Sequence, residues 1–313
     1  MRDILSIGEM VIDFLPGSEP GSYLRKAGGA PANIIIATSR MGLSSAFCGK
    51  LGDDDFGHFL ADTLKENGVE ICVPDFTDKA ITTMAFVTLS ESGERSFTFA
   101  RKPGADMFLT TQDVDGADIN GTTIVHAGSC SLSQPPASDA TIYGMKLAHE
   151  AGKLVSFDVN YRNLMWNDDK AAASRAVLSV LPYVDLLKIS DEEVDIIGGE
   201  QAIPAIMKEN NISVLVETLG SKGSRWYYDG LTETEPSIPS ECVDTCGAGD
   251  AFWGAFLATL VNNGVKTAAD LSADVIRKAA RTGSISGALC VRKKGAIESL
   301  PTLKDIKEFE SNE

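Results

Sequence analysis

Short apolar segments with the composition of β-strands alternate with longer segments of helical periodicity through most of the 313-residue chain. Parallel strands need a long connection between them, usually a helix, so this order predicts a mostly parallel sheet covered by helices. The fold class is therefore α/β. Predicted strands cover residues 4–8, 122–127, 153–158, 184–189 and 212–217, and predicted helices cover 31–41, 56–67, 139–151, 170–180, 248–262 and 272–289.

Two stretches interrupt the alternation, at residues 10–24 and about 72–101. Both lack helical periodicity, and the second is rich in threonine and phenylalanine, which favour strands. No linker rich in proline, glycine or serine separates either stretch from its neighbours. We therefore expect a single domain, residues 1–313, that carries these two stretches as a small β-rich flap.

The formal net charge of −16 limits the possible partners. A strongly acidic surface repels nucleic acid and anionic lipid, so neither is an expected partner. Any phosphate site must then be built locally, from backbone N–H groups, a few cationic side chains and a divalent metal.

The six cysteines contain no C-x-x-C pair, and the three histidines have no metal-ligand spacing. Reduced thiols are typical of a cytoplasmic protein. The N-terminus begins directly with a strand rather than a signal peptide, and no apolar run reaches the roughly 18 residues of a membrane span. We expect a cytoplasmic protein with no membrane partner.

The sharpest motif is a glycine-rich turn that leads into the predicted helix 248–262. Small residues let a backbone approach a ligand closely, and a helix start offers unpaired N–H groups with a positive dipole end. Together these features predict an anion hole for a phosphoryl group. Asp250, in the first helical turn, could face an attacking hydroxyl. The alternative is a capped helix after a glycine turn. The motif reads Asp244-Thr245-Cys246-Gly247-Ala248-Gly249-Asp250.

A second motif precedes the helix predicted at 31–41 and reads Gly28-Gly29-Ala30-Pro31-Ala32-Asn33. The paired glycines again permit close approach of a ligand. The amide of Asn33 can both donate to and accept from sugar hydroxyls. The alternative is a helix start in which these residues serve only as a cap.

Residues 28–57 and 244–257 resemble the two signatures of the PfkB (ribokinase-like) carbohydrate kinase family, and the stretches at 8–14, 50–57 and 102–107 look most like fructokinases. The resemblance implies a ribokinase-like, doubly wound α/β/α sandwich with a small β-rich lid. It implies transfer of the ATP γ-phosphoryl group to a sugar hydroxyl, with Asp250 as the base and the Gly247, Ala248, Gly249 and Asp250 backbone as the anion hole.

The resemblance also carries over individual sugar contacts. Asp13, Gly28, Gly29 and Asn33 are similar to positions that hold sugar hydroxyls in the family. Asn160 and Arg162, in a segment after the strand 153–158, resemble residues that face the site. Arg101, just after the flap strand around Phe97–Phe99, resembles a lid arginine that reaches the sugar or the transferring phosphate.

On the nucleotide side, Lys188 and Glu193 lie in a segment similar to the one where a glutamate orders magnesium-bound water. Thr218, Gly220 and Gly223 resemble the ATP-binding turn. Asp244, Cys246 and Ser299 match positions that hold K⁺ in some members. The expected cofactors are thus ATP and Mg²⁺, with K⁺ as a further candidate. Ser190, Val159, Cys246 and Ala100 depart from residues common in the family.

The expected activity is that of a fructokinase, which forms D-fructose 6-phosphate. The alternatives are 2-keto-3-deoxygluconate kinase, then ribokinase or nucleoside kinase, and a sensing protein that keeps the fold without chemistry. The chain has no G-x-x-x-x-G-K-[ST] loop, and Phe252 stands at the third glycine position of a dinucleotide fingerprint, which argues against a nicotinamide enzyme. Lids in the family often pair across a two-fold axis, so a homodimer is expected.

Overall fold

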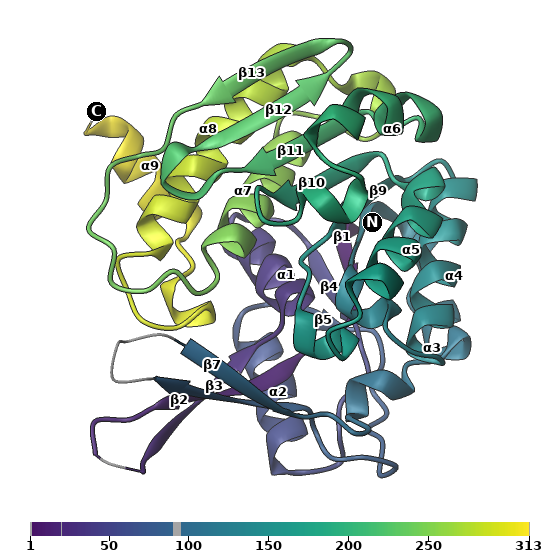
Figure 1. Cartoon of the computed structure of the whole chain (residues 1–313), viewed down its shortest axis with the longest axis vertical. Helices are drawn as coiled ribbons and strands as arrows, with labels where there is room; N and C mark the ends of the chain where they lie inside the picture. Colours follow the sequence, from purple (N-terminus) through teal and green to yellow (C-terminus); the bar gives the residue numbers. More distant parts are fainter. Residues whose placement is uncertain (1, 20, 90–94, 313) are drawn as a thin grey trace.

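A computed structural model describes residues 2–19, 21–89 and 95–312. Its main layer is a nine-stranded sheet with the order β13-β12-β11-β10-β9-β8-β1-β4-β5 (Figure 1). From β5 to β11 all neighbouring strands run parallel, whereas β12 and β13 are added antiparallel at one edge. The strands are β1 (Arg2–Ile7), β4 (Ser45–Cys48), β5 (Glu70–Ile71), β8 (Thr122–Gly128), β9 (Leu154–Asp158), β10 (Leu186–Ser190), β11 (Val214–Thr218), β12 (Ser224–Tyr228) and β13 (Leu231–Glu235).

Helices cover both faces of this sheet, because successive side chains of each buried strand point to opposite sides. Ile4 and Leu186 pack into the core on one face, whereas Leu5 and Leu187 pack into the core on the other. The first face carries α1 (Ala30–Arg40), α2 (Asp55–Glu66), α7 (Ala248–Asn262), α8 (Ala273–Cys290) and α9 (Leu303–Ser311). The second carries α3 (Thr111–Asp115), α4 (Ala137–Glu150), α5 (Lys170–Val180) and α6 (Ile203–Asn210).

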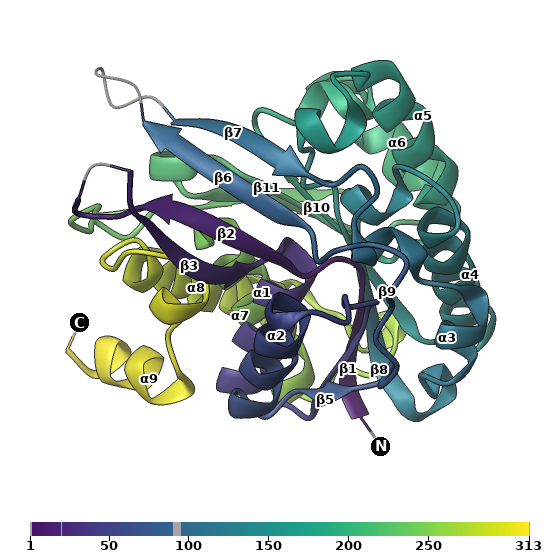
Figure 2. The same cartoon turned by 90° about the horizontal axis from the view of Figure 1, so that it is seen from below.

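A second, four-stranded sheet lies beside the main layer, with the order β3-β2-β6-β7 (Figure 2). Phe14 of β2 stacks on Phe86 of β6 with ring centroids 4.9 Å apart, and it meets Phe56 of α2 edge-on at 5.7 Å. The first contact joins two strands of the small sheet, and the second attaches this sheet to α2. Its strands are β2 (Val11–Pro16), β3 (Tyr23–Gly28), β6 (Met84–Leu89) and β7 (Arg95–Ala100).

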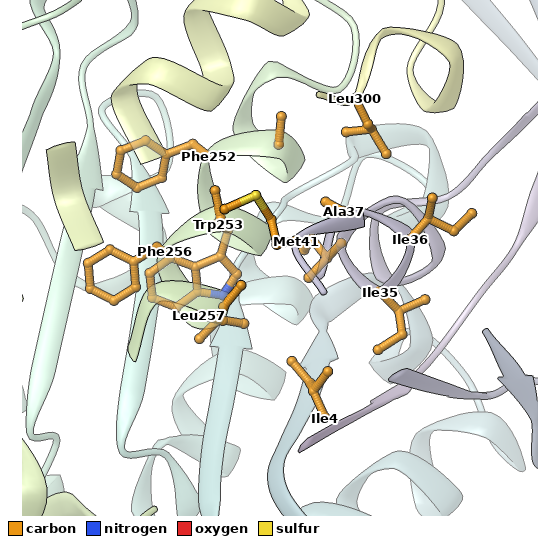
Figure 3. Close-up of a cluster of buried hydrophobic side chains, with 14 of the residues drawn as sticks. Ile4, Ile35, Ile36, Ala37, Met41, Phe252, Trp253, Phe256, Leu257 and Leu300 are labelled. Atoms are coloured by element: carbon orange, nitrogen blue, oxygen red, sulfur yellow. The ribbon is translucent and has the colours of Figure 1, made fainter. Parts of the chain in front are cut away.

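Helices α1 and α7 pack closely, as the buried side chains in Figure 3 show. A Cβ atom at Gly254 would lie 2.5 Å from the Cβ of Ala37, so only glycine allows this approach. Trp253 lies stacked on Phe256 in the same core, with ring centroids 4.8 Å apart. The N-terminal ends of the two helices are thereby held side by side.

Candidate active site

Asn33 and Asp250 meet at these two helix starts, although 217 positions separate them in the sequence. Each lies in the first turn of its helix, α1 after Gly29 and α7 after Gly247. The Nδ2 of Asn33 donates to Oδ2 of Asp250 at 2.8 Å, and both side chains are buried. Burial raises the pKa of Asp250, while the Asn33 hydrogen bond opposes that shift. Asn33 therefore orients the carboxylate and favours its ionised form.

The turn before α7 has the backbone that an anion hole needs. Gly247 has φ +75°, and a Cβ there would lie 2.9 Å from the Cβ of Ala296, so glycine is required. The N–H of Ala248 already donates to the carbonyl of Thr245 at 3.2 Å. This corrects the sequence-based expectation that all four N–H groups of the turn are available. Among the described residues, no backbone acceptor takes the N–H groups of Gly247, Gly249 and Asp250.

A buried ion pair lies next to this turn. The Nζ of Lys188 donates to both carboxylate oxygens of Asp158, at 3.0 and 2.9 Å, and the two side chains are only 5% and 1% exposed. The same Nζ lies 3.6 Å from the position that a Cβ would take at Gly249. Burial alone would lower the pKa of Lys188, but Asp158 and Glu193 outweigh it and raise that pKa. Lys188 is therefore a fixed cation beside the turn that precedes α7.

Glu193 is anchored by the backbone on either side of it. Its Oε1 accepts from the N–H of Tyr161 at 2.7 Å, and its Oε2 accepts from the N–H of Ser190 at 2.8 Å. A carboxylate has about four lone-pair positions, so each oxygen keeps one free. No group of three His, Cys, Asp or Glu side chains in the described ranges could hold a metal directly. The donor set thus fits a metal that Glu193 contacts through water.

Asp13 and Arg162 lie close enough to Asp250 for its charge to act on the pKa of each. Burial raises the pKa of Asp13 to about 6; Arg162 lowers it and the charge of Asp250 raises it further. Arg162 is exposed when the whole residue is counted, but its charged group is desolvated: burial lowers the pKa of Arg162, whereas Asp250, Glu193 and Asp158 raise it. Its guanidinium therefore lies among the acidic groups of the site, which keep it charged.

Gly28 and Gly29 lie against Asp13 and Glu9. A Cβ at Gly28 would lie 2.1 Å from Oδ2 of Asp13, and one at Gly29 would lie 2.7 Å from the carbonyl oxygen of Glu9. Gly29 also has φ +104°. Gly28 lets the end of β3 approach Asp13 of β2, and Gly29 lets the start of α1 approach the link between β1 and β2.

Three buried acceptor atoms in this neighbourhood have no hydrogen-bond partner among the described residues: Oδ1 of Asn33, Oδ1 of Asn160 and Oε2 of Glu9. Asn160 follows β9 and donates weakly to Asp158 at 3.4 Å, which places it beside the Lys188 pair. Buried acceptors without donors are costly. A ligand with several hydroxyl groups would supply donors to the two asparagine oxygens.

Arg101 gives its hydrogen bonds to other partners. Its Nε and Nη2 lie 2.9 and 2.8 Å from Oδ2 of Asp106, and its Nη1 donates to Ser133 at 3.1 Å. It lines a cavity of about 450 Å³ between the end of β7 and residues 164–167. It lies close enough to Glu9 to lower the pKa of that carboxyl group. The structure thus places Arg101 beside the site with its guanidinium held by Asp106.

The expected ATP turn lies after β11, next to β10. The hydroxyl of Thr218 donates to the carbonyl of Ile189 at 3.3 Å, which joins the ends of the two strands. Gly220 and Gly223 flank a short turn, both with positive φ. A Cβ at Gly223 would lie 2.1 Å from the carbonyl of Glu235. The turn therefore lies on the β10 side of the anion hole.

Asp244, Cys246 and Ser299 gather around one loop. Asp244 accepts from the N–H of Cys246 at 2.9 Å and from the N–H of Gly295 at 3.1 Å. Ser299 donates to the carbonyl of Gly295 at 2.6 Å. The structure therefore brings the three residues together, directly before the anion-hole turn.

Comparisons with known proteins agree with this geometry. A model of the pfkB family carbohydrate kinases matches residues 1–303. This chain belongs to the pfkB family of carbohydrate kinases. Fructokinase-2 of Oryza sativa subsp. japonica is 39% identical to this pfkB kinase over 318 residues, covering 98% of this chain and 93% of the relative.

Solved structures give the same result. A fructokinase with bound ATP from Xylella fastidiosa matches this pfkB kinase with a TM-score of 0.91 and 31% identity, over 99% of both chains. A fructokinase from Vibrio cholerae O395, in a form that binds fructose, ADP and a calcium ion, matches with a TM-score of 0.89 and 31% identity, also over 99% of both. The expected ribokinase-like α/β fold is confirmed.

Sequence reasoning did not single out two buried carboxylates of this pfkB kinase. Asp158 was included only in the predicted strand 153–158, and its ion pair with Lys188 was not predicted. No role was predicted for Glu9. Asp158 is the last residue of β9, and Glu9 comes two residues after the end of β1, both strands of the parallel part of the sheet. Ligands of open α/β sheets bind at that edge, so an acidic residue at a strand end was the available signal.

Proposed function

We propose that this carbohydrate kinase is an ATP-dependent fructokinase that transfers the γ-phosphoryl group of ATP to O6 of D-fructose. The observation that most strongly supports this is the position of Asp250. Its carboxylate lies in the first turn of α7, with one oxygen held by Asn33. The neighbouring N–H groups of Gly247 and Gly249 have no backbone acceptor in the part of the chain that the structure describes. A proton acceptor and an anion hole are thus adjacent.

Phosphoryl transfer depends on in-line placement and charge stabilisation more than on covalent chemistry by the protein. Asp250 accepts the proton of the attacking hydroxyl. The N–H groups of Gly247, Gly249 and Asp250 donate hydrogen bonds to the phosphoryl oxygens and so stabilise the negative charge that develops there. Lys188, fixed by Asp158, adds a positive charge next to Gly249. Arg101 would complete the site when the lid closes and water is excluded.

The sugar would occupy the space bordered by Asp13, Asn33, Asn160 and Arg162, against the backbone of Gly28 and Gly29. The unpaired Oδ1 atoms of Asn33 and Asn160 support a ligand that donates several hydrogen bonds. A site of this kind discriminates strongly against molecules that leave its polar groups unpaired. Fructose as the particular sugar is supported by the fructokinase relatives, one of which binds fructose and ADP.

ATP would lie along the turn of Thr218, Gly220 and Gly223, with its phosphates toward Gly247 and Gly249. Mg²⁺ supplies positive charge that neutralises the phosphate oxygens. Glu193 would contact it through water, because both of its oxygens are anchored yet keep a lone pair. A monovalent cation, K⁺, would be held near Asp244, Cys246 and Ser299, where it would stiffen the anion-hole turn.

An assay of ADP release with a panel of sugars tests the proposal. We expect kcat/KM for fructose to exceed the values for 2-keto-3-deoxygluconate, ribose and adenosine, with fructose 6-phosphate as the product. The keto-deoxy acid is the second candidate, because Arg162 makes no ion pair within the described residues and could receive a carboxylate. A keto-deoxy acid preferred by tenfold or more would reject the fructokinase assignment. ADP release with no sugar of the panel would favour a sensing protein.

We also propose that the enzyme is one domain with a lid, acts in the cytoplasm and forms a homodimer through the small sheet. Strand β3 is an edge of that sheet, and it exposes Tyr23 and Leu24. Exposed edges favour pairing with another chain. No described helix is long and apolar enough to cross a membrane. Light scattering at micromolar concentration should give twice the mass of 33.3 kDa, and a monomer would contradict the dimer.

A further inference from the structure

Glu9 is a buried carboxylate that the mechanism above does not use. It lies in the link between β1 and β2 and is 4% exposed, and its Oε2 has no partner among the described residues. Burial raises the pKa of Glu9 to about 7, while its own backbone N–H, Arg101 and Arg162 oppose the rise. An ionised carboxylate in such a place needs a hydrogen-bond donor, because an unpaired charge in the interior is strongly unfavourable.

Two guanidinium groups lie near enough to Glu9 to lower its pKa. Arg101 is already committed, since it pairs with Asp106 and donates to Ser133. The side chain of Arg162 makes no hydrogen bond or ion pair in the described part of the chain, although its charged group is desolvated. Arg162 is thus the cation that remains available to Glu9.

Arg162 needs an anchor because of what surrounds it. Asp250, Glu193 and Asp158 all act on its pKa, so several carboxylates compete for one guanidinium. A direct pair between Arg162 and Asp250 would hold the base in its ionised form, lower its pKa and weaken it as a proton acceptor. An anchor on the opposite side would hold the guanidinium in the site without tying up Asp250.

We propose that Glu9 is a positioning residue, whose free Oε2 anchors the guanidinium of Arg162 when the substrates fill the site. The proposal rests on the fructokinase function above. It assigns Glu9 no contact with the reacting atoms, and it predicts that Glu9 acts only through Arg162.

A double-mutant cycle on kcat/KM for fructose tests the coupling. Its variants are Glu9→Gln, Arg162→Gln and the double variant. Removing the group that orients a functional residue typically lowers activity about 10- to 100-fold, the range known for partners of metal ligands. We expect a loss of that size for Glu9→Gln. The double variant should be within about twofold of Arg162→Gln alone, because independent effects would multiply instead.

A second cycle, with Arg101→Gln in place of Arg162→Gln, is the matched control. There the two losses should multiply, since Arg101 is held by Asp106. Glu9→Gln should also keep or raise the melting temperature, because it replaces an unpaired buried carboxylate by a neutral amide of the same shape.

The proposal is overturned if the losses in kcat/KM of Glu9→Gln and Arg162→Gln multiply in the double variant, or if Glu9→Gln is coupled to Arg101→Gln alone. It is also overturned if Glu9→Gln leaves activity unchanged, or if it lowers the melting temperature, which would indicate a structural role. These outcomes all presuppose a wild-type enzyme that phosphorylates fructose. A wild-type protein inactive on every sugar rejects the proposed function instead, so the two failures are distinguishable.

Discussion

The Asp158–Lys188 ion pair should make Lys188→Met strongly destabilising. Both side chains are almost fully buried, and Nζ contacts the two carboxylate oxygens at 3.0 and 2.9 Å. Substituting methionine removes the cation and leaves the Asp158 carboxylate without a charge partner. Breaking a buried pair in this way typically costs about 3–5 kcal/mol, because an uncompensated charge remains in the interior. We expect a loss of that size in the free energy of unfolding.

Equilibrium urea unfolding followed by tryptophan fluorescence measures the loss. Adding Asp158→Asn to Lys188→Met should recover most of the stability, because no unpaired buried charge then remains. Activity should stay low, because the cation next to Gly249 is still missing. Lys304→Met is the matched control. Lys304 pairs with Glu308 at 3.5 Å, but the two side chains are 82% and 61% exposed, so the cost should stay below about 1 kcal/mol. A loss below about 1 kcal/mol for Lys188→Met would refute the reasoning.

Two further predictions concern protons and ions. The pKa of Glu9 is raised from 4.5 to about 7, so the folded state binds an extra proton between these pH values. As the pH rises through this range, the free energy of unfolding of the wild type should fall by up to roughly 3 kcal/mol relative to Glu9→Gln. Parallel pH profiles of the two proteins in urea unfolding would contradict this. Chelation of Mg²⁺ should abolish activity, because an acidic protein lacks enough cations to hold ATP, and retained turnover in excess chelator would reject the metal requirement. K⁺ should raise kcat above the value in a large organic cation, and equal rates in both would remove the monovalent site near Asp244 while leaving the Mg²⁺ claim standing.

The regular part of the fold was predictable because its strands and helices are long and strongly patterned. The helices expected at 170–180 and 248–262 match α5 and α7. The sequence analysis did not anticipate β5, which has two residues, or β13, whose LTETE sequence carries two acidic residues and has no apolar core face. Such edge strands form because the adjacent strand presents backbone N–H and C=O groups for pairing. This depends on the fold rather than on local propensity.

Within the site, the identity of the candidate residues could be predicted from the sequence, but their pairing could not. Asn33 and Asp250 were both expected to face the sugar, but their 2.8 Å contact depends on the close packing of α1 and α7 at Gly254. The role of Glu9 could not be inferred without the fold, because its burial and its proximity to Arg162 arise from segments about 150 positions apart. Ala248 was expected to offer its N–H, but the local turn already uses it.

Asp250→Asn is the measurement that tests the central claim most directly. The substitution keeps the shape of the side chain and its place beside Asn33, and it removes the proton acceptor. Loss of a general base typically lowers the rate about 10²- to 10⁴-fold. We predict a fall in kcat of that size with fructose, while the Kd for ATP measured by calorimetry changes little. Near-normal turnover by the Asp250→Asn enzyme would contradict the account.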